Sequence, residues 1–114
     1  MARQGVFQQT GDIIDFVNTG TDTIAAGQVV PLGTRIGFAA VDIAPNATGG
    51  VVVKGVFSDV PADTTAAFGV GDVLYWNATA NKLTKTATDN VPTGGWSVMA
   101  KAQATATAVI RLVG

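Results

Sequence analysis

The segment 68–84 reads FGVGDVLYWNATANKLT and has the pattern of a β-hairpin. Gly69 and Gly71 permit a tight turn at its start, and the apolar run 73–76 is rich in residue types that favour strands. The polar stretch 77–81 then supplies a loop before a second short extended stretch. This segment predicts an all-β fold.

Short apolar stretches separated by turn residues recur along the rest of the chain, a pattern typical of a compact antiparallel β-barrel or sandwich. Pro31 indicates a sheet edge because proline cannot donate to a ladder, and Gly55 indicates a bulge. Residues 60–67 alone have a helical pattern, no longer than one turn, with Asp63 as its cap. We expect strands at 12–18, 28–32, 35–43, 51–59, 96–102 and 108–112, a half-buried strand pair over 102–108, and turns or connections at 45–50 and 85–95.

The residue inventory argues against an enzyme. The chain contains no histidine, cysteine or glutamate, so its eight aspartates are the only side chains that ionise below neutral pH. General acid–base catalysis near pH 7 usually depends on histidine or a shifted carboxylate, and zinc and iron sites usually need imidazole or thiolate. Neither Ser58 nor Thr64 and Thr65 has a histidine to activate it, and a serine–lysine pair with Lys54 or Lys101 has only composition in its favour.

The charge balance argues against nucleic acid as a partner. The formal net charge is −1, and the seven lysines and arginines are scattered rather than gathered into a basic patch. Charged residues make up 13% of the chain against 47% hydrophobic residues, which favours a surface covered by a partner. The chain has no apolar run of membrane-spanning length and no hydrophobic signal region after residues 1–5, so we expect a soluble protein made in the cytoplasm, with no membrane partner.

Two further patterns have ordinary structural explanations. Asp12, Asp15 and Asp72 are oxygen ligands in principle, but their spacing fits no cation-binding loop, and a carboxylate after a glycine often caps a turn. The sequons at Asn46 and Asn77 carry little weight in a chain without a signal sequence. We therefore expect no cofactor and no metal.

The motifs together resemble the capsid cement, or head decoration, proteins of phages and prophages. The hairpin contributes a glycine, then Gly71-Asp72, then a strand that ends in Tyr75-Trp76. Other pieces fall in the order that this family has, so the resemblance covers most of residues 10–114: 27–30, 36–40, 55–57 and 109–112. The resemblance implies a virion structural protein without enzymatic activity. It would sit on the outer surface of the capsid, bind the major capsid protein and bridge capsomers as a homotrimer, after assembly in the host cytoplasm.

We expect residues 1–10 to be a flexible N-terminal arm and residues 11–114 to form a single β domain. The arm has few apolar side chains to order it. On a capsid it could add a strand to a sheet edge, with these residues as the docking set: Arg3, Val6, Phe7, Gln8 and Gln9. A second set lies in apolar strand contexts and belongs to the core or to a subunit interface: Val73, Leu74, Tyr75, Trp76 and Trp96.

Two alternatives remain open at this point. Tyr75 and Trp76 could form an aromatic stacking platform in a carbohydrate- or cell-surface-binding module. The resemblance also does not separate a cement protein from a head-fibre or tail subunit.

Overall fold

The structure is a computed structural model that describes residues 11–113. The arm residues 1–10, with their proposed docking set, lie outside the described residues. Residues 11–113 contain no helix, and nothing in them is long and apolar enough to cross a membrane as a helix. They form nine strands: β1 (Ile13–Val17), β2 (Val29–Pro31), β3 (Ile36–Ala39), β4 (Thr48–Val52), β5 (Lys54–Pro61), β6 (Val73–Asn77), β7 (Lys82–Thr84), β8 (Val91–Ser97) and β9 (Thr107–Val113).

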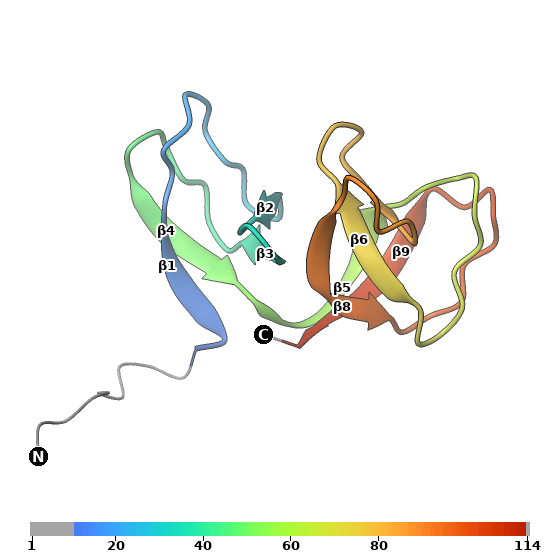
Figure 1. Ribbon diagram of the computed structural model, residues 1–114. Helices are drawn as coiled ribbons and strands as arrows, with labels where there is room; N and C mark the ends of the chain where they lie inside the picture. The colour runs from blue at the N-terminus through green and yellow to red at the C-terminus, as the bar shows by residue number, and fades with distance from the viewer. Residues whose placement is uncertain (1–10, 114) are drawn as a thin grey trace, which may run out of the picture.

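The strands form two antiparallel sheets (Figure 1). The first sheet has the order β1-β4-β3-β2, and the second has the order β5-β9-β8-β6-β7. The chain crosses from one sheet to the other between β4 and β5, through Val53 alone. The outer strands β5 and β7 touch through the isolated parallel bridge Ala62–Leu83 rather than through a ladder. The all-β prediction is confirmed, and the architecture is sandwich-like rather than a closed barrel.

The second sheet repeats the arrangement of the first. In the order in which they lie side by side, β1-β4-β3-β2 of the first sheet correspond to β5-β9-β8-β6 of the second. The second sheet has one additional strand, β7, which lies in the connection between β6 and β8. The turns match atom for atom: Gly27 N donates to Ala39 O, and Gly71 N donates to Ser97 O, both at 2.7 Å. The isolated bridges that flank these turns match as well: Ile24–Ile43 in the first copy and Phe68–Lys101 in the second. The chain is therefore built from two copies of one four-strand unit.

The core has two parts, one for each copy. The smaller part lies on one face of the first sheet, where Val30, Ala39, Ile43 and Val51 are buried. The larger part is formed mainly by buried residues of the second unit: Val60, Ala62, Phe68, Leu74, Trp76, Leu83, Ala108, Ile110 and Leu112. Ile36 and Phe38 of β3 belong to this larger part although their strand lies in the first sheet. β3 therefore joins the two units.

Several local predictions are confirmed. The hairpin forms from β6 and β7, with Trp76 opposite Leu83 and Asn81 at a positive φ of 56° in the loop. Pro31 ends β2, which is an edge strand. Along β1 the half-buried side chains alternate with exposed ones, as expected for a strand with one covered face. In β9 the predicted inward residues are buried: Ala108, Ile110 and Leu112.

The predicted strand at 51–59 is wrong, because it is two strands in two sheets. β4 already begins at Thr48, inside the predicted turn, and β5 begins at Lys54. Gly49 allows this early start, since a Cβ there would lie 2.5 Å from the Ile43 side chain. Gly55 has a positive φ of 128°, but the register shift of β5 comes later, between Phe57 and Val60.

Three other predictions are also wrong. The segment 60–67 has no helical turn, because Pro61 and Ala62 still pair with the sheet and the Asp63 side chain accepts a hydrogen bond from Thr65 N at 2.8 Å. The connection 85–95 already contains the start of β8, and that strand ends at Ser97, so residues 98–102 do not continue it. Residues 102–106 form an exposed loop rather than a half-buried strand pair.

Candidate functional site

One face of the second sheet points away from the core, and we call it the outer face. Strand register places these side chains on it, among others: Lys54, Val56, Val73, Tyr75, Trp96, Arg111 and Val113. Three of these are exposed valines, with 60% of Val56, 59% of Val73 and 54% of Val113 accessible. The neighbouring inward residues, such as Ile110 and Leu112, are buried. Both faces of this sheet are therefore apolar, although the core covers only one of them.

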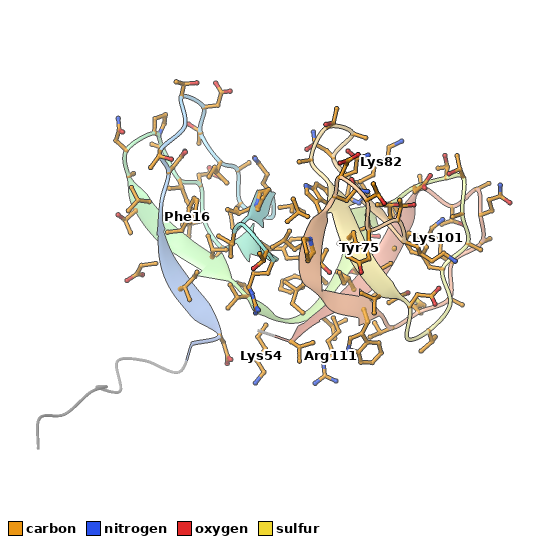
Figure 2. All side chains as sticks on the ribbon, viewed as in Figure 1. Phe16, Lys54, Tyr75, Lys82, Lys101 and Arg111 are labelled. Carbon is orange, nitrogen blue, oxygen red and sulfur yellow. The ribbon has the colours of Figure 1, made fainter. Side chains whose placement is uncertain are left out.

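The outer face also carries aromatic and cationic groups. Trp96 and Tyr75 are half-buried, and Arg111 lies over the Trp96 ring with its Cζ 5.9 Å from the ring centroid. A guanidinium at this distance interacts with the electron-rich ring face. Lys54 and Arg111 lie on the same side of the molecule (Figure 2), and Arg111 sits between Val56 and Trp96 in the strand register. An apolar strip that also carries two cations suits a protein partner with complementary acidic groups.

The structure divides the five predicted core or interface residues between two environments. Leu74 and Trp76 are 0% and 4% exposed and point into the core. Val73, Tyr75 and Trp96 lie on the outer face. The proposed stacking platform of Tyr75 and Trp76 is wrong, because consecutive strand residues face opposite sides of a sheet.

Two polar contacts hold β8 in the sheet beside this face. The Thr93 hydroxyl donates to Leu74 O at 2.6 Å and accepts from Gly95 N at 3.1 Å, where the β6–β8 register shifts. Gly95 packs so closely on β9 that a Cβ would lie 2.2 Å from Arg111 O. The position of Trp96 next to Arg111 thus requires glycine at position 95, because any side chain there would push β8 away from β9.

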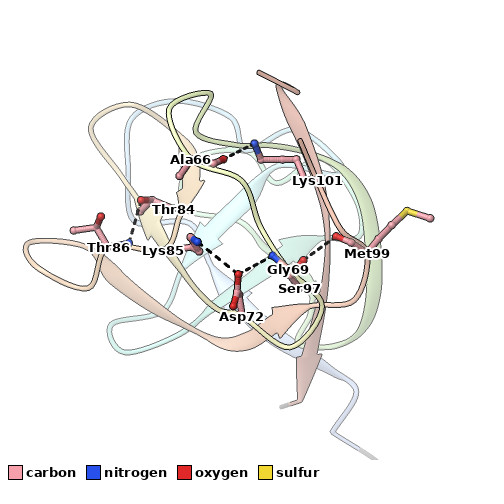
Figure 3. Close-up of polar contacts among 9 residues, drawn as sticks. All are labelled: Ala66, Gly69, Asp72, Thr84, Lys85, Thr86, Ser97, Met99 and Lys101. Atoms are coloured by element: carbon pink, nitrogen blue, oxygen red, sulfur yellow. Dashed lines mark hydrogen bonds and ion pairs between the residues drawn. The ribbon is translucent and has the colours of Figure 1, made fainter. Parts of the chain in front are cut away.

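Lys101 is the buried cation of the second unit, with 6% of the residue exposed. Its Nζ donates to Ala66 O, Ala102 O and Gln103 O at 2.9, 3.0 and 3.2 Å, and lies 4.7 Å from the Phe68 ring centroid (Figure 3 shows the bond to Ala66). An ammonium has three protons, and all three are used. This lysine ties two loops together, and the arrangement leaves it unsuited to act as the base of a serine–lysine pair.

The aspartates considered as metal ligands have separate surroundings. Asp72 Oδ2 accepts from Gly69 N at 2.7 Å and lies 3.7 Å from Lys85 Nζ (Figure 3), so it closes the turn before β6. Asp15 lies in β1 of the other sheet, and Asp12 directly precedes that strand, where its carbonyl oxygen accepts from Val53 N at 2.9 Å. Across residues 11–113, no three Asp, Glu, His or Cys side chains gather where they could hold a metal ion.

One pKa shift stands out in the loop after β5. The Thr65 hydroxyl donates to Asp63 Oδ1 at 2.6 Å and Thr65 N donates to the same oxygen at 2.8 Å. These bonds stabilise the charged form and hold the pKa of the Asp63 carboxyl below its usual range. The shift reflects a turn that caps itself, so it supports a structural role for Asp63.

Sequence reasoning missed four residues of the outer face: Lys54, Val56, Arg111 and Val113. The pattern that could have identified them is the alternation of inward and outward residues along 109–113, the strand that pairs with residues 54–57. Within β9 it separates Arg111 and Val113 from the inward-facing Ile110 and Leu112. The interruption at Val53 hid the partner strand, because it merged β4 and β5 into one predicted element.

Neither the search of curated proteins nor the search of solved structures finds a match to this chain. A scan against family models does find one: the model described as "Phage cement protein" matches residues 8–112, nearly the whole chain. The chain belongs to the phage cement protein family and is a structural component of the phage capsid.

Proposed function

We propose that the protein cements the outer surface of the phage head as a homotrimer that bridges neighbouring capsomers and binds the major capsid protein. The family match over residues 8–112 carries this proposal. A clamp of this kind needs a rigid fold and many weak contacts summed over a lattice, and it needs no catalytic group. Assembly would take place in the host cytoplasm, without nucleic acid or membrane as a partner.

The outer face supports self-association. Val56, Val73 and Val113 are all more than half exposed, and Tyr75 and Trp96 extend the apolar strip between them. Exposed apolar surface of this extent commonly marks an interface. Three copies around a local three-fold axis would cover it, together with Lys54 and Arg111.

Residues 1–10 are proposed to contribute the attachment to the capsid. Val6 and Phe7 are the apolar anchors, while Arg3, Gln8 and Gln9 supply polar contacts. An extended segment of this kind can add a strand to a sheet edge of the capsid protein. Deletion of residues 1–9 should leave folding and self-association intact and should weaken binding to heads that lack cement.

The test is reconstitution on purified heads that lack their own cement, followed by electron cryo-microscopy. We expect density for three copies around local three-fold axes and a rise in the temperature at which the heads break open. Val73→Asp should reduce occupancy, because it places a charge on the outer face. Met99→Asp is the matched control, since Met99 is 61% exposed in the loop after β8 and is not part of the outer face. Isolated monomers away from any symmetry axis would refute the trimer, and no binding at all would refute the function.

A carbohydrate-binding role has one observation in its favour, since Tyr75 and Trp96 share the outer face. Glycans that stack on Trp96 would change its fluorescence emission. An emission spectrum unchanged by a panel of cell-surface glycans favours the structural role. A head-fibre or tail position would appear in the same reconstitution as density away from the shell of the head.

A further inference from the structure

A groove of about 700 Å³ opens between the two sheets, and Val56 of the outer face belongs to its lining. The first sheet contributes Val29, Phe38 and Val52 to its wall, and the second contributes the run 56–61 together with Trp76. This volume is within the range of ligand-binding pockets.

The floor of the groove is apolar and already ordered. The rings of Phe38 and Phe57 stack with their centroids 4.1 Å apart and their planes 20° apart, and the two residues come from different sheets. Phe38, Val60 and Trp76 are each less than 7% exposed, so the core holds them in place. A side chain that enters the groove therefore meets a preformed surface, which lowers the entropic cost of binding.

Strand β5 presents an open edge to this groove. Within residues 11–113, β9 is the only strand laddered with β5. Val109 O accepts a hydrogen bond from Val98 N, so the backbone of Val109 points toward β8. Backbone groups of successive strand residues point to opposite sides, so Ile110 points toward β5, where it is paired with Phe57. The N–H and C=O of the next residue, Val56, therefore point away from β9. The register shift after Phe57 also leaves Ser58 and Asp59 outside the ladder. Backbone groups at an open edge are a template for an added strand.

The charge of the groove selects among extended segments. Asp59 is its one charged lining residue; it is exposed and has a positive φ of 57°. The remaining polar lining side chains are neutral: Gln28, Ser58 and Asn81. A complementary segment would have an apolar or aromatic side chain above the Phe38–Phe57 pair and a lysine or arginine beside Asp59.

We propose that an extended segment of the capsid protein, with an apolar anchor and a neighbouring basic residue, adds as a strand to the β5 edge in this groove. This inference rests on the proposed function, and it adds a second contact to the one assigned to residues 1–10. The two contacts run in opposite directions, since each protein lends a strand to a sheet edge of the other. Reciprocal exchange of strands raises the effective concentration at the second site once the first is made.

Two variants test the contact on heads that lack cement. Val56→Pro removes the N–H that points away from β9, toward the open edge, and leaves the β5–β9 bonds. Val56→Ala is its reference variant, because it shortens the same outer-face side chain but keeps this N–H. Asp59→Asn removes the charge and tolerates the positive φ. Asp89→Asn is its matched control, since Asp89 is also exposed and has a φ of 61°. We expect Val56→Pro to bind about tenfold more weakly than Val56→Ala, and Asp59→Asn about tenfold more weakly than the wild type, as for loss of one good hydrogen bond or charged contact. Asp89→Asn should bind like the wild type.

Cross-linking identifies the occupant. The chain has no cysteine, so Ser58→Cys provides a unique site for a benzophenone label in the groove, and Thr88→Cys provides one in an exposed loop away from it. The label at position 58 should join a capsid-protein peptide that contains lysine or arginine, and the label at 88 should not. Cross-links only to a second copy of this chain, or wild-type binding by both variants, would overturn the inference while leaving the cement function in place. Failure of the wild-type protein to bind heads would instead refute the function itself.

Discussion

Replacement of Lys101 by methionine tests whether a buried cation holds the second unit together. Methionine keeps the length and most of the packing of the side chain, so the change removes three hydrogen bonds to carbonyl oxygens and the contact with the Phe68 ring. Hydrogen bonds to charged groups contribute about 1.5–3 kcal/mol each, and a cation–π contact contributes about 0.5–2 kcal/mol.

The net effect is smaller than the sum, because burial of an ammonium costs several kcal/mol that methionine avoids. The three carbonyl oxygens are only partly buried at this site, so water reaches some of them in the variant. We expect Lys101→Met to lower the free energy of unfolding by about 2–3 kcal/mol, since an unpaired carbonyl costs roughly 1–3 kcal/mol. For a domain of this size that corresponds to a fall in Tm of roughly 8–13 °C.

Urea unfolding followed by tryptophan fluorescence measures this difference, because Trp76 is buried in the same core. Lys82→Met is the matched control: Lys82 is exposed on β7, and its loss should change the free energy of unfolding by no more than about 0.5 kcal/mol. A Lys101→Met protein as stable as the wild type would show that desolvation of the ammonium cancels its bonds, and the argument for Lys101 as a stabilising tie would fail.

Two further predictions concern local packing and pH. Gly95→Ala should prevent native folding, because its Cβ would lie 2.2 Å from Arg111 O, and circular dichroism should show loss of the sheet signal. Gly69→Ala is the control and should fold, since the nearest atom to its Cβ lies at 3.5 Å. A natively folded Gly95→Ala protein would contradict the close packing of β8 on β9. Asp63 has a folded-state pKa below its unfolded value of about 3.9, so its contribution to stability is present above that value and is lost as pH falls through the lowered pKa. Asp63→Asn keeps an oxygen that can accept from Thr65 but cannot titrate. Its urea midpoints, measured from pH 6 to pH 2, should therefore fall less steeply than those of the wild type. Identical curves would show that Asp63 does not contribute to the pH dependence of stability.

The all-β class and the hairpin could be predicted because both depend on local patterns. Alternation of apolar residues gave β1 and β9, and the polar loop between β6 and β7 gave the turn. The burial of Leu74 and Trp76 against the exposure of Val73 follows from the same alternation once the strand is assigned.

The division into two sheets could not be read from local patterns. Residues 48–61 are extended almost without interruption, and the change of sheet at Val53 depends on which distant strands pair on either side. The repeat of the four-strand unit did leave a trace in the sequence. Gly27-Gln28-Val29-Val30 and Gly71-Asp72-Val73-Leu74 occupy equivalent turns, and in each the fourth-position side chain is buried. The repeat is obscured because β7 and its loops lengthen only the second copy.

The groove was beyond sequence reasoning for a related reason. Its walls come from β2, β3, β4, β5 and β6, and Phe38 and Phe57 meet only because the two sheets face one another across it. No pattern within 28–38 or within 56–61 indicates that the other segment lies opposite.

The shared strand β3 has a consequence for how the protein unfolds. All four of its residues are buried, but Ala39 packs in the smaller core while Ile36 and Phe38 pack in the larger one. Detachment of the first sheet would therefore open the core of the second, although each unit has its own strand ladder. A duplicated protein could melt in two steps, one for each copy, but here the copies are coupled through one short strand, so heat should unfold them in a single cooperative transition. If the protein bridges capsomers as proposed, this coupling would let the whole molecule resist a local pull on either half.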